Sequence, residues 1–418
     1  MIALVDCNNF YASCERVFNH KVRNKPVVVL SNNDGCAIAR SQEAKDLGIE
    51  MGTPYFEMKE LIKQHDIHVF SSNYALYGDM SRRVNMILQA FTPNIEVYSI
   101  DESFLDLSGF VNKNLAEYGR EIRQRILQCT DIPTCVGIAP TKSLAKIANK
   151  LAKRDKASGV RVLEREEDIE NALRIIDIGD VWGVGRRYKK MLQSYGIKTA
   201  YDFTQQSGIW VKEKMSIVGY RLWQELQGKA CLTLEMIQPP KKGICTSKSF
   251  ANNISDFDIL KEAVASHAAR CAEKLRKQHS CAKMITIFLQ TNPFRLDQRQ
   301  YYPSKVINMP VASNSTTEIV KYAITALKLI YKPDYAYKKA GVIVTGIIPS
   351  NEIQQGIFDN VPRAKQKALM QSIDKINKRM GKDKVRTAAQ GYKKEWDMRR
   401  DLLSPEYTTK LSDLLKVN

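Results

Sequence analysis

The chain has only five histidines, and none of its nine cysteines forms a Cys-x-x-Cys pair. Scattered cysteines in an odd number are typical of reduced, mostly buried thiols, so they argue against a zinc site and a disulfide framework. No apolar run approaches the ~18 residues of a membrane span. The N-terminal stretch lacks the basic segment and long apolar core of a signal peptide. These absences predict a cytoplasmic protein with no membrane partner.

Acidic residues are also scarce, since 45 Asp and Glu stand against 64 Lys and Arg, a net charge of +19. In a folded protein this excess favours a polyanionic partner, with nucleic acid first and an anionic membrane surface second. Residues 361–418 alone carry 15 basic and 7 acidic residues. With 418 residues, 44% of them hydrophobic, the chain is expected to build about two to four domains with sizeable cores.

Carboxylates follow or interrupt two apolar stretches. Ile2–Val5 reads as a buried strand that ends at Asp6, and Glu96–Leu107 reads as a hairpin whose turn holds Asp101 and Glu102. Carboxylate oxygens at such positions suit a hard divalent cation. If the two strands are neighbours, the three carboxylates converge on one site. Taken alone, the Asp-Glu pair is better explained as an ordinary solvated turn, and the rest of the sequence has to favour the metal site.

Basic residues gather in two further motifs. Four lysines from Lys142 to Lys153 recur at helical spacing and share one face, opposite an apolar stripe. That face is either simply solvated or lies beside a polyphosphate, which would relieve the repulsion among like charges. Farther on, Gly183 and Gly185 lead into Arg186 and Arg187 between predicted helices. This pattern indicates a helix-hairpin-helix element, whose glycines let backbone N–H groups approach a DNA phosphate.

Segment boundaries are also readable. Ala37–Leu47 is predicted to be one helix that stops at Gly48. Gln238–Gly243, with two prolines and two lysines, reads as a linker. Beyond it, strand-like runs alternate with two helical patterns and predict a compact α+β domain with helices on one face of a sheet; the strands are 284–290, 305–309 and 340–348, and the helices 257–278 and 316–331.

Together these motifs resemble the Y-family of translesion DNA polymerases, and within it the UmuC-like branch of bacterial DNA polymerase V and its plasmid-borne relatives. The resemblance spans essentially the whole chain and rests on residues 5–15, 30–36, 98–104, 181–187 and 403–409. It implies an α+β multidomain, right-hand polymerase with these parts: a ferredoxin-like palm (1–18 and 78–167), small fingers (19–77), a helical helix-hairpin-helix thumb (168–235), a linker (236–242), an α/β little finger (243–350), and a clamp-binding motif with a UmuC-type C-terminal extension (351–418).

The resemblance also assigns catalytic roles. Two Mg²⁺ ions would be bound by Asp6, Asp101, Glu102 and the backbone carbonyl of Cys7, and the three carboxylates would serve catalysis. Where some members carry an additional Asp, this chain has Asn8. The reaction implied is template-directed transfer of dNMP to a primer 3′-hydroxyl past damaged bases, without proofreading, in the SOS response.

Nucleotide and DNA contacts follow from the same comparison. Tyr11 would be the steric gate that excludes a ribose 2′-hydroxyl, with a core tyrosine as the alternative explanation. Many members have Arg where this chain has Lys45. A lysine cannot bind the triphosphate in the bidentate geometry of Arg. The residues expected to bind the dNTP are Phe10, Tyr11, Lys45 and Lys153; those expected to bind DNA are Lys142, Lys146, Gly183, Gly185, Arg186 and Arg187.

Several partners are implied besides primer-template DNA. Gln354, Ile357 and Phe358 resemble the pentapeptide that docks in the bacterial sliding clamp. The basic tail would contact UmuD′-like subunits or a RecA-type recombinase filament, or simply DNA, in a cytoplasmic, nucleoid-associated protein. Two other functions stay open: a non-catalytic DNA-binding scaffold of a mutagenesis complex, and another palm-type nucleotidyl enzyme such as a nucleotide cyclase.

Overall fold

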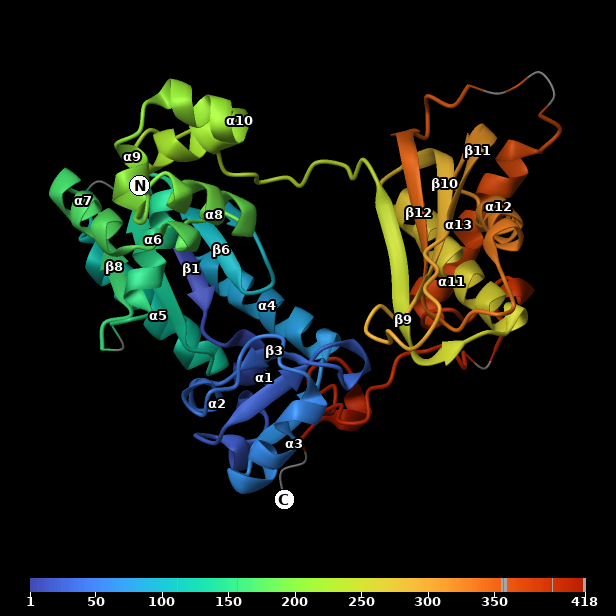
Figure 1. The fold of residues 1–418 in the computed structure, drawn as a ribbon, viewed down its shortest axis with the longest axis horizontal. Coiled ribbons are helices and arrows are strands. Elements are labelled where there is room, and N and C mark those ends of the chain that lie inside the picture. The colour runs from blue at the N-terminus through green and yellow to red at the C-terminus, as the bar shows by residue number, and fades with distance from the viewer. Residues whose placement is uncertain (111, 156, 355, 357–358, 393, 416–418) are drawn as a thin grey trace. The chain divides into compact units, whose positions relative to one another are not determined.

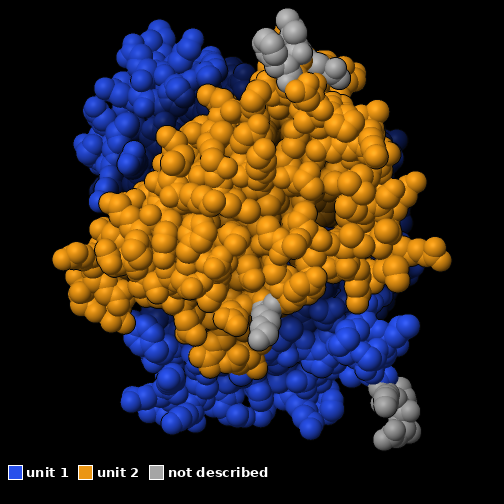
Figure 2. All heavy atoms as spheres, turned by 90° about the vertical axis from the view of Figure 1, so that its right-hand side faces the viewer, with its two compact units in different colours: residues 1–31, 35–238, 402–418 blue, residues 32–34, 239–401 orange. Residues whose placement is uncertain are grey.

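The computed structural model describes residues 1–418 except 111, 156, 355, 357–358, 393 and 416–418. It divides into two compact units, coloured in Figure 2: unit 1 comprises 1–31, 35–238 and 402–418, and unit 2 comprises 32–34 and 239–401. The chain enters the main part of unit 2 after Gln238, within the predicted linker, and the predicted extension is shared between the units. Across the described residues, no helix is both long and apolar enough to cross a membrane.

Unit 1 is organised around a five-stranded sheet of order β5-β6-β1-β7-β8 (Figure 1). The predicted strand after Met1 and the predicted hairpin are both confirmed, because β1 lies antiparallel to β6, and β5 pairs antiparallel with β6. The strands are β1 (Ile2–Cys7), β5 (Ile95–Val97), β6 (Glu102–Asp106), β7 (Thr134–Ala139) and β8 (Val160–Val162).

Alternating side chains of β1 give this sheet a core on each face. Ala3, Val5 and Cys7 pack with one set of helices, whereas Leu4 packs with another. The first set is α1 (Phe10–Val17), α4 (Tyr74–Leu88) and α5 (Leu115–Thr130); the second begins with α6 (Lys142–Ala152).

Helix α6 approaches the sheet very closely at Gly137. A side chain there would collide with the backbone of Asn149 and Ala145, so only glycine fits. The Asn149 amide then bonds across the contact, donating to the carbonyls of Leu4 at 3.2 Å and Cys135 at 2.8 Å. This buried polar clamp fixes α6 beside the end of β1.

A smaller sheet of order β3-β2-β4 follows α1 in the chain. The prediction of a single helix over Ala37–Leu47 is wrong, because its first part is strand β3, which pairs with β2. Ser41 caps the short helix that follows, accepting a hydrogen bond from the Ala44 N–H. The elements are η1 (His20–Val22), β2 (Val27–Leu30), η2 (Asn32–Asp34), β3 (Ala37–Arg40), α2 (Gln42–Asp46), α3 (Tyr55–Gln64) and β4 (His68–Ser71).

Helices dominate the chain from residue 166 to residue 226. Their apolar side chains, among them Leu173, Phe203 and Leu226, join the α6 core. Helix α10 contains a kink at Ser216, whose φ is 62°. The elements are α7 (Glu166–Ile175), η3 (Ile178–Asp180), α8 (Arg186–Ser194), α9 (Ala200–Thr204) and α10 (Gly208–Leu226).

Unit 2 is an antiparallel sheet of order β11-β10-β12-β9 with helices α11 and α12 packed on it. This confirms the α+β prediction beyond the linker, although strand β9 was not anticipated. The elements are β9 (Ile244–Ile254), α11 (Phe257–Lys277), β10 (Ser280–Thr291), β11 (Ser304–Ser313), α12 (Thr316–Ile330), β12 (Tyr337–Pro349), α13 (Arg363–Met380) and η4 (Ala388–Gln390); η5 (Leu411–Asp413) belongs to unit 1.

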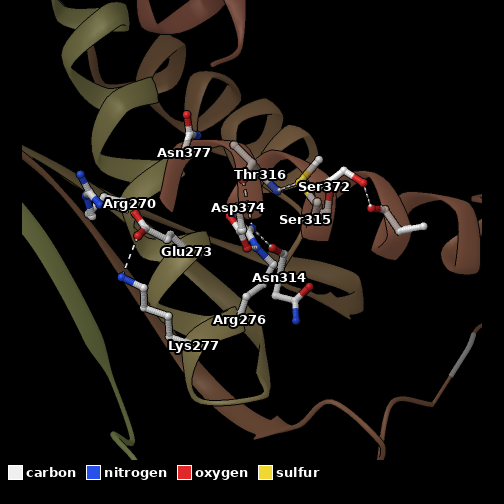
Figure 3. Close-up of polar contacts among 12 residues, drawn as sticks. Arg270, Glu273, Arg276, Lys277, Asn314, Ser315, Thr316, Ser372, Asp374 and Asn377 are labelled. Carbon is white, nitrogen blue, oxygen red and sulfur yellow. Dashed lines mark hydrogen bonds and ion pairs between the residues drawn. The ribbon is translucent and has the colours of Figure 1, made fainter. Parts of the chain in front are cut away.

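The first part of the C-terminal extension is built into unit 2. In Figure 3, Arg276 of α11 binds both carboxylate oxygens of Asp374 on α13, each at 2.7 Å, and donates to the carbonyl of Asn314. Farther along, Trp396 is buried in the unit 2 core beside His267. Polar and apolar contacts therefore both hold this part of the extension.

Candidate active site

The strand register brings the three predicted catalytic carboxylates together. Asp6 on β1 lies directly opposite Glu102 on β6, so the two side chains emerge on the same face of the sheet. The N–H of Cys7 donates to the carbonyl of Asp101 at 2.9 Å, which ties the hairpin turn to the end of β1. The Asp101 carboxylate in turn accepts from the Ser99 hydroxyl at 2.6 Å.

Two lysines meet these carboxylates, one on α6 and one directly after that helix. Lys153 lies 2.7 Å from Asp6, and Lys146 lies 2.8 Å from Glu102. The Lys146 ammonium also stands over the Tyr98 and Trp182 rings, 4.6 and 5.2 Å from their centroids. The close packing of α6 on the sheet at Gly137 therefore has a chemical consequence, because it places two ammonium groups beside the three carboxylates.

The electrostatics of Asp6 reflect this crowding. Burial is the main cause that raises its pKa from 3.8 to about 6; Lys153 opposes the rise, while Glu102 and Asp101 add to it. The influence of both other carboxylates on Asp6 is the electrostatic sign that all three share one site.

The donor set suits hard divalent ions. Three carboxylates and an adjacent backbone carbonyl are oxygen ligands of the kind that Mg²⁺ prefers. Within the described residues, however, no three acidic, thiol or imidazole groups already enclose a metal position. One oxygen of Asp6 and one of Glu102 each lie within ion-pair distance of a lysine. A metal ion bound at these oxygens would compete with the two ammonium groups.

Helix α1 begins next to the carboxylates, and it carries the predicted gate. Tyr11 is half-buried, and its ring stacks on Tyr77 with centroids 4.3 Å apart. The Phe10 ring lies in the core at 3% exposure, so its predicted nucleotide contact stays a prediction that only the backbone of this residue could meet. Asn9 starts the helix in a left-handed conformation without a side-chain cap, which leaves N–H groups at this end for another acceptor. Asn8 donates to the Cys135 thiol.

A second group of cations stands near this helix start. Lys45 donates to the Asn9 side-chain oxygen at 2.6 Å. Its pKa is lowered, first by burial and then by the positive charges of Arg40 and Lys153, whereas Asp6 raises it. Arg40 was missed from the sequence because its strand was read as helix. The cue was Ser41, a helix-capping residue that separates the strand from α2.

The four lysines from Lys142 to Lys153 are not a bare basic face. Each is paired with an acid: Lys142 with Glu96, Lys146 with Glu102, Lys150 with Asp180, and Lys153 with Asp6. The Lys142 side chain is only 5% exposed and also donates to the Thr233 carbonyl at 2.7 Å. Its assignment as a DNA contact is therefore corrected to a buried structural role.

The helix-hairpin-helix candidates lie on the surface. Arg186 and Arg187 are exposed in the first turn of α8, and Gly185 precedes them as the helix cap. Gly183 has φ +94°, a conformation that other residues rarely adopt. Of the clamp-like motif, Gln354 is exposed, while Ile357 and Phe358 lie outside the described residues.

Comparison with known proteins gives this geometry a context. The chain matches the impB/mucB/samB family over residues 5–150 and the C-terminal domain of that family over 241–357. Residues 367–417 match a domain of unknown function.

Individual relatives agree with the family match. The chain is 44% identical to the protein UmuC of Salmonella typhimurium, covering 100% of both chains. It is 42% identical to the protein ImpB of Salmonella typhimurium over 99% of each, and 25% identical to DNA polymerase IV of Staphylococcus aureus (strain JH9) over 85% of this chain and 97% of that protein.

Two solved structures share the fold at 24% identity, each covering 84% of this chain and all of its own. One is a Y-family DNA polymerase chimera of Dbh and Dpo4, with a TM-score of 0.67. The other is an insertion ternary complex of Dbh DNA polymerase, with a TM-score of 0.53.

Proposed function

This chain belongs to the impB/mucB/samB family of Y-family DNA polymerases, and from that premise we propose how its residues carry out the reaction. The protein is a DNA-directed DNA polymerase that performs translesion synthesis, and such a nucleotide-polymerising enzyme needs divalent metal ions.

Asp6, Asp101, Glu102 and the Cys7 carbonyl are the proposed ligands of two Mg²⁺ ions. The observation that carries this proposal is the register that sets Asp6 opposite Glu102, with Asp101 tied to Cys7. Bound there, the ions would activate the primer 3′-hydroxyl and stabilise the charge of the departing pyrophosphate. The chain itself supplies the fixed strand ends that hold the acids in place.

The incoming dNTP is proposed to bind at the start of α1. Lys45, Lys153 and Arg40 concentrate positive charge there, and the uncapped helix end adds N–H donors, so a triphosphate is the anion that fits. Lys153 would exchange its ion pair with Asp6 for a phosphate oxygen. Tyr11, half-buried on the same helix, would then lie against the sugar and exclude a 2′-hydroxyl.

Primer extension on a damaged template tests the carboxylate assignment. Asp101→Asn is expected to lower extension by about a hundredfold or more, the scale of losing one electrostatic contact to a transition state, while DNA binding is retained. Asp131→Asn is the matched control, because Asp131 has the left-handed conformation that asparagine also tolerates. Wild-type extension by Asp101→Asn would refute the assignment and favour a catalytic site elsewhere.

Partner contacts form a separate group of proposals. Arg186 and Arg187 would bind template phosphates, aided by the hairpin glycines, because they are exposed at the start of a helix. Gln354, Ile357 and Phe358 would dock in a sliding clamp at the nucleoid. UmuD′-like subunits and a RecA-type filament are proposed from the likeness to UmuC. Phe358→Ala should abolish clamp-stimulated synthesis and leave basal extension intact.

A further inference from the structure

Residues 402–407 belong to unit 1 and lie close to the helix that bears Tyr11. Residues 402–407, here called the terminal segment, begin with a two-way contact to β4, because the Ser71 N–H donates to the Leu402 carbonyl at 2.9 Å and the Leu402 N–H to the Ser71 hydroxyl at 3.0 Å. Farther along, the Tyr407 ring stacks on Phe18, with centroids 5.0 Å apart. Phe18 is the C-cap residue of α1, directly after Val17.

Asn73 holds the middle of the terminal segment. Its side-chain amide donates to the Ser404 carbonyl and hydroxyl, both at 3.0 Å, and to the Pro405 carbonyl at 3.2 Å. Its side-chain oxygen meanwhile accepts from the Leu76 N–H and caps α4. Asn73 is 2% exposed and Ser404 is 7% exposed, so these hydrogen bonds are shielded from water. One residue thus fixes both α4 and the terminal segment.

A buried carboxylate links the terminal segment to the two helices. Ser404 donates to Oε1 of Glu15 at 3.0 Å, and the Tyr77 hydroxyl of α4 donates to the same oxygen at 2.6 Å. Glu15 is 1% exposed, and burial raises its pKa to about 7. Glu15 follows Tyr11 by four residues on α1, so both side chains lie on one helix face.

The last link is aromatic. Tyr77, held by Glu15, stacks against Tyr11 with an interplanar angle of 14°, and Tyr74 meets the Tyr11 ring edge-on at 6.1 Å. The contacts therefore run from Ser404 through Glu15 and Tyr77 to Tyr11. None of the three side chains before Tyr11 is proposed to touch a nucleotide.

We propose that Ser404, seated by the terminal segment, is a positioning residue for sugar selection: it holds Glu15 and Tyr77 so that the Tyr11 ring keeps the orientation that excludes a ribonucleotide. This inference rests on the proposed gate role of Tyr11. It gives a task to the end of the domain of unknown function, within the part that matches over 367–417. A purely structural role would change stability without changing the choice of sugar.

Single-nucleotide insertion by the full-length protein tests this directly. The measured quantity is the ratio of kcat/KM for a dNTP to that for the matching rNTP. Ser404→Ala is expected to lower the ratio about three- to tenfold, because part of one hydrogen bond to a buried carboxylate is transmitted to the ring. The loss should come from faster rNTP insertion, with dNTP insertion retained.

Two substitutions serve as matched controls. Ser404→Thr keeps the hydroxyl and should keep the wild-type ratio. Ser412→Ala makes the same chemical change at an exposed serine whose hydroxyl donates to the neighbouring Asp413, and it should have no effect. An equal loss in Ser412→Ala would overturn the inference, since the effect would then not depend on the Glu15 contact.

Tyr11→Ala separates this inference from the gate assignment. If Tyr11→Ala leaves the sugar preference unchanged, the gate assignment fails; if it abolishes the preference while Ser404→Ala retains it, only the positioning role fails. In the double variant, Ser404→Ala should cause no further loss, and an additive loss would overturn the inference. Should Ser404→Ala melt below the assay temperature, Tyr77→Phe makes the same test, because it removes the hydroxyl that binds Glu15 and keeps the stacked ring; the same loss is expected and the same result would refute the inference.

Discussion

Lys142 offers a direct test of whether the basic face of α6 serves DNA or the fold. Its ammonium is paired with Glu96 and donates to the Thr233 carbonyl at 2.7 Å, while Glu96 also accepts from the Glu235 N–H at 2.8 Å. Lys142→Met keeps the apolar stem but removes the charge. It leaves the Glu96 carboxylate buried, at 8% side-chain exposure, with the Glu235 N–H but no lysine.

The expected cost follows from that burial. Removing one partner of a buried ion pair destabilises a protein by about 3–5 kcal/mol, because the remaining charge stays out of water. For a unit the size of unit 1, each kcal/mol lowers the melting temperature by about 2–4 °C, so a fall of about 10 °C is expected. Adding Glu96→Leu should recover most of the loss, because the stranded charge disappears.

Thermal unfolding and DNA affinity against salt concentration separate the two roles. Lys142→Met should lower the melting temperature and leave the salt dependence of DNA binding unchanged. Arg187→Met, at an exposed site, should leave the melting temperature unchanged. It should reduce the slope of log affinity against log salt by about one phosphate contact. A Lys142→Met protein with wild-type stability and a reduced salt slope would refute the reasoning and restore Lys142 as a DNA contact.

Three further predictions concern other parts of the chain. Burial lifts the pKa of Glu15 from 4.5 to about 7, so the native state favours its neutral form: stability should fall by up to about 3 kcal/mol as pH rises through that interval, and urea unfolding of Glu15→Gln should lack this fall. Gly183→Ala should cost about 1–2 kcal/mol in thermal unfolding because of its φ of +94°, whereas Gly185→Ala, at φ −79°, should cost little. Arg276→Met strips Asp374 of both its bonds and should speed hydrogen exchange in α13 without lowering primer extension on undamaged DNA.

Sequence patterns located the carboxylates well because each lies at the edge of a short-range signal. Asp6 ends an apolar strand, and Asp101 and Glu102 interrupt a hairpin, so local periodicity was enough to select them. Periodicity does not predict which strands pair or in which register. The register that sets Asp6 against Glu102 joins residues nearly a hundred positions apart, and only the folded sheet supplies it.

The failures have a common physical cause. Helical spacing correctly grouped the α6 lysines, yet it could not tell whether their face meets water or acids, because Glu96 lies 46 positions from Lys142. Strand β9 was missed because most of its residues are not buried; the buried ones, Ile244, Phe250 and Ile254, are too far apart to form an alternating apolar run. In both cases tertiary contacts decided an outcome that local preference left open.

Tyr11 shows how far this non-locality reaches into function. Its place on α1 is evident from a short motif, but the orientation of its ring depends on Tyr77, and through Glu15 on a serine 389 positions away from that carboxylate. If Tyr11 is the gate, sugar selection in this polymerase would depend on more than the one residue under the nucleotide. If the proposed chain of contacts holds, a change in the terminal segment alters which nucleotides enter DNA, while every proposed metal ligand and phosphate contact stays intact.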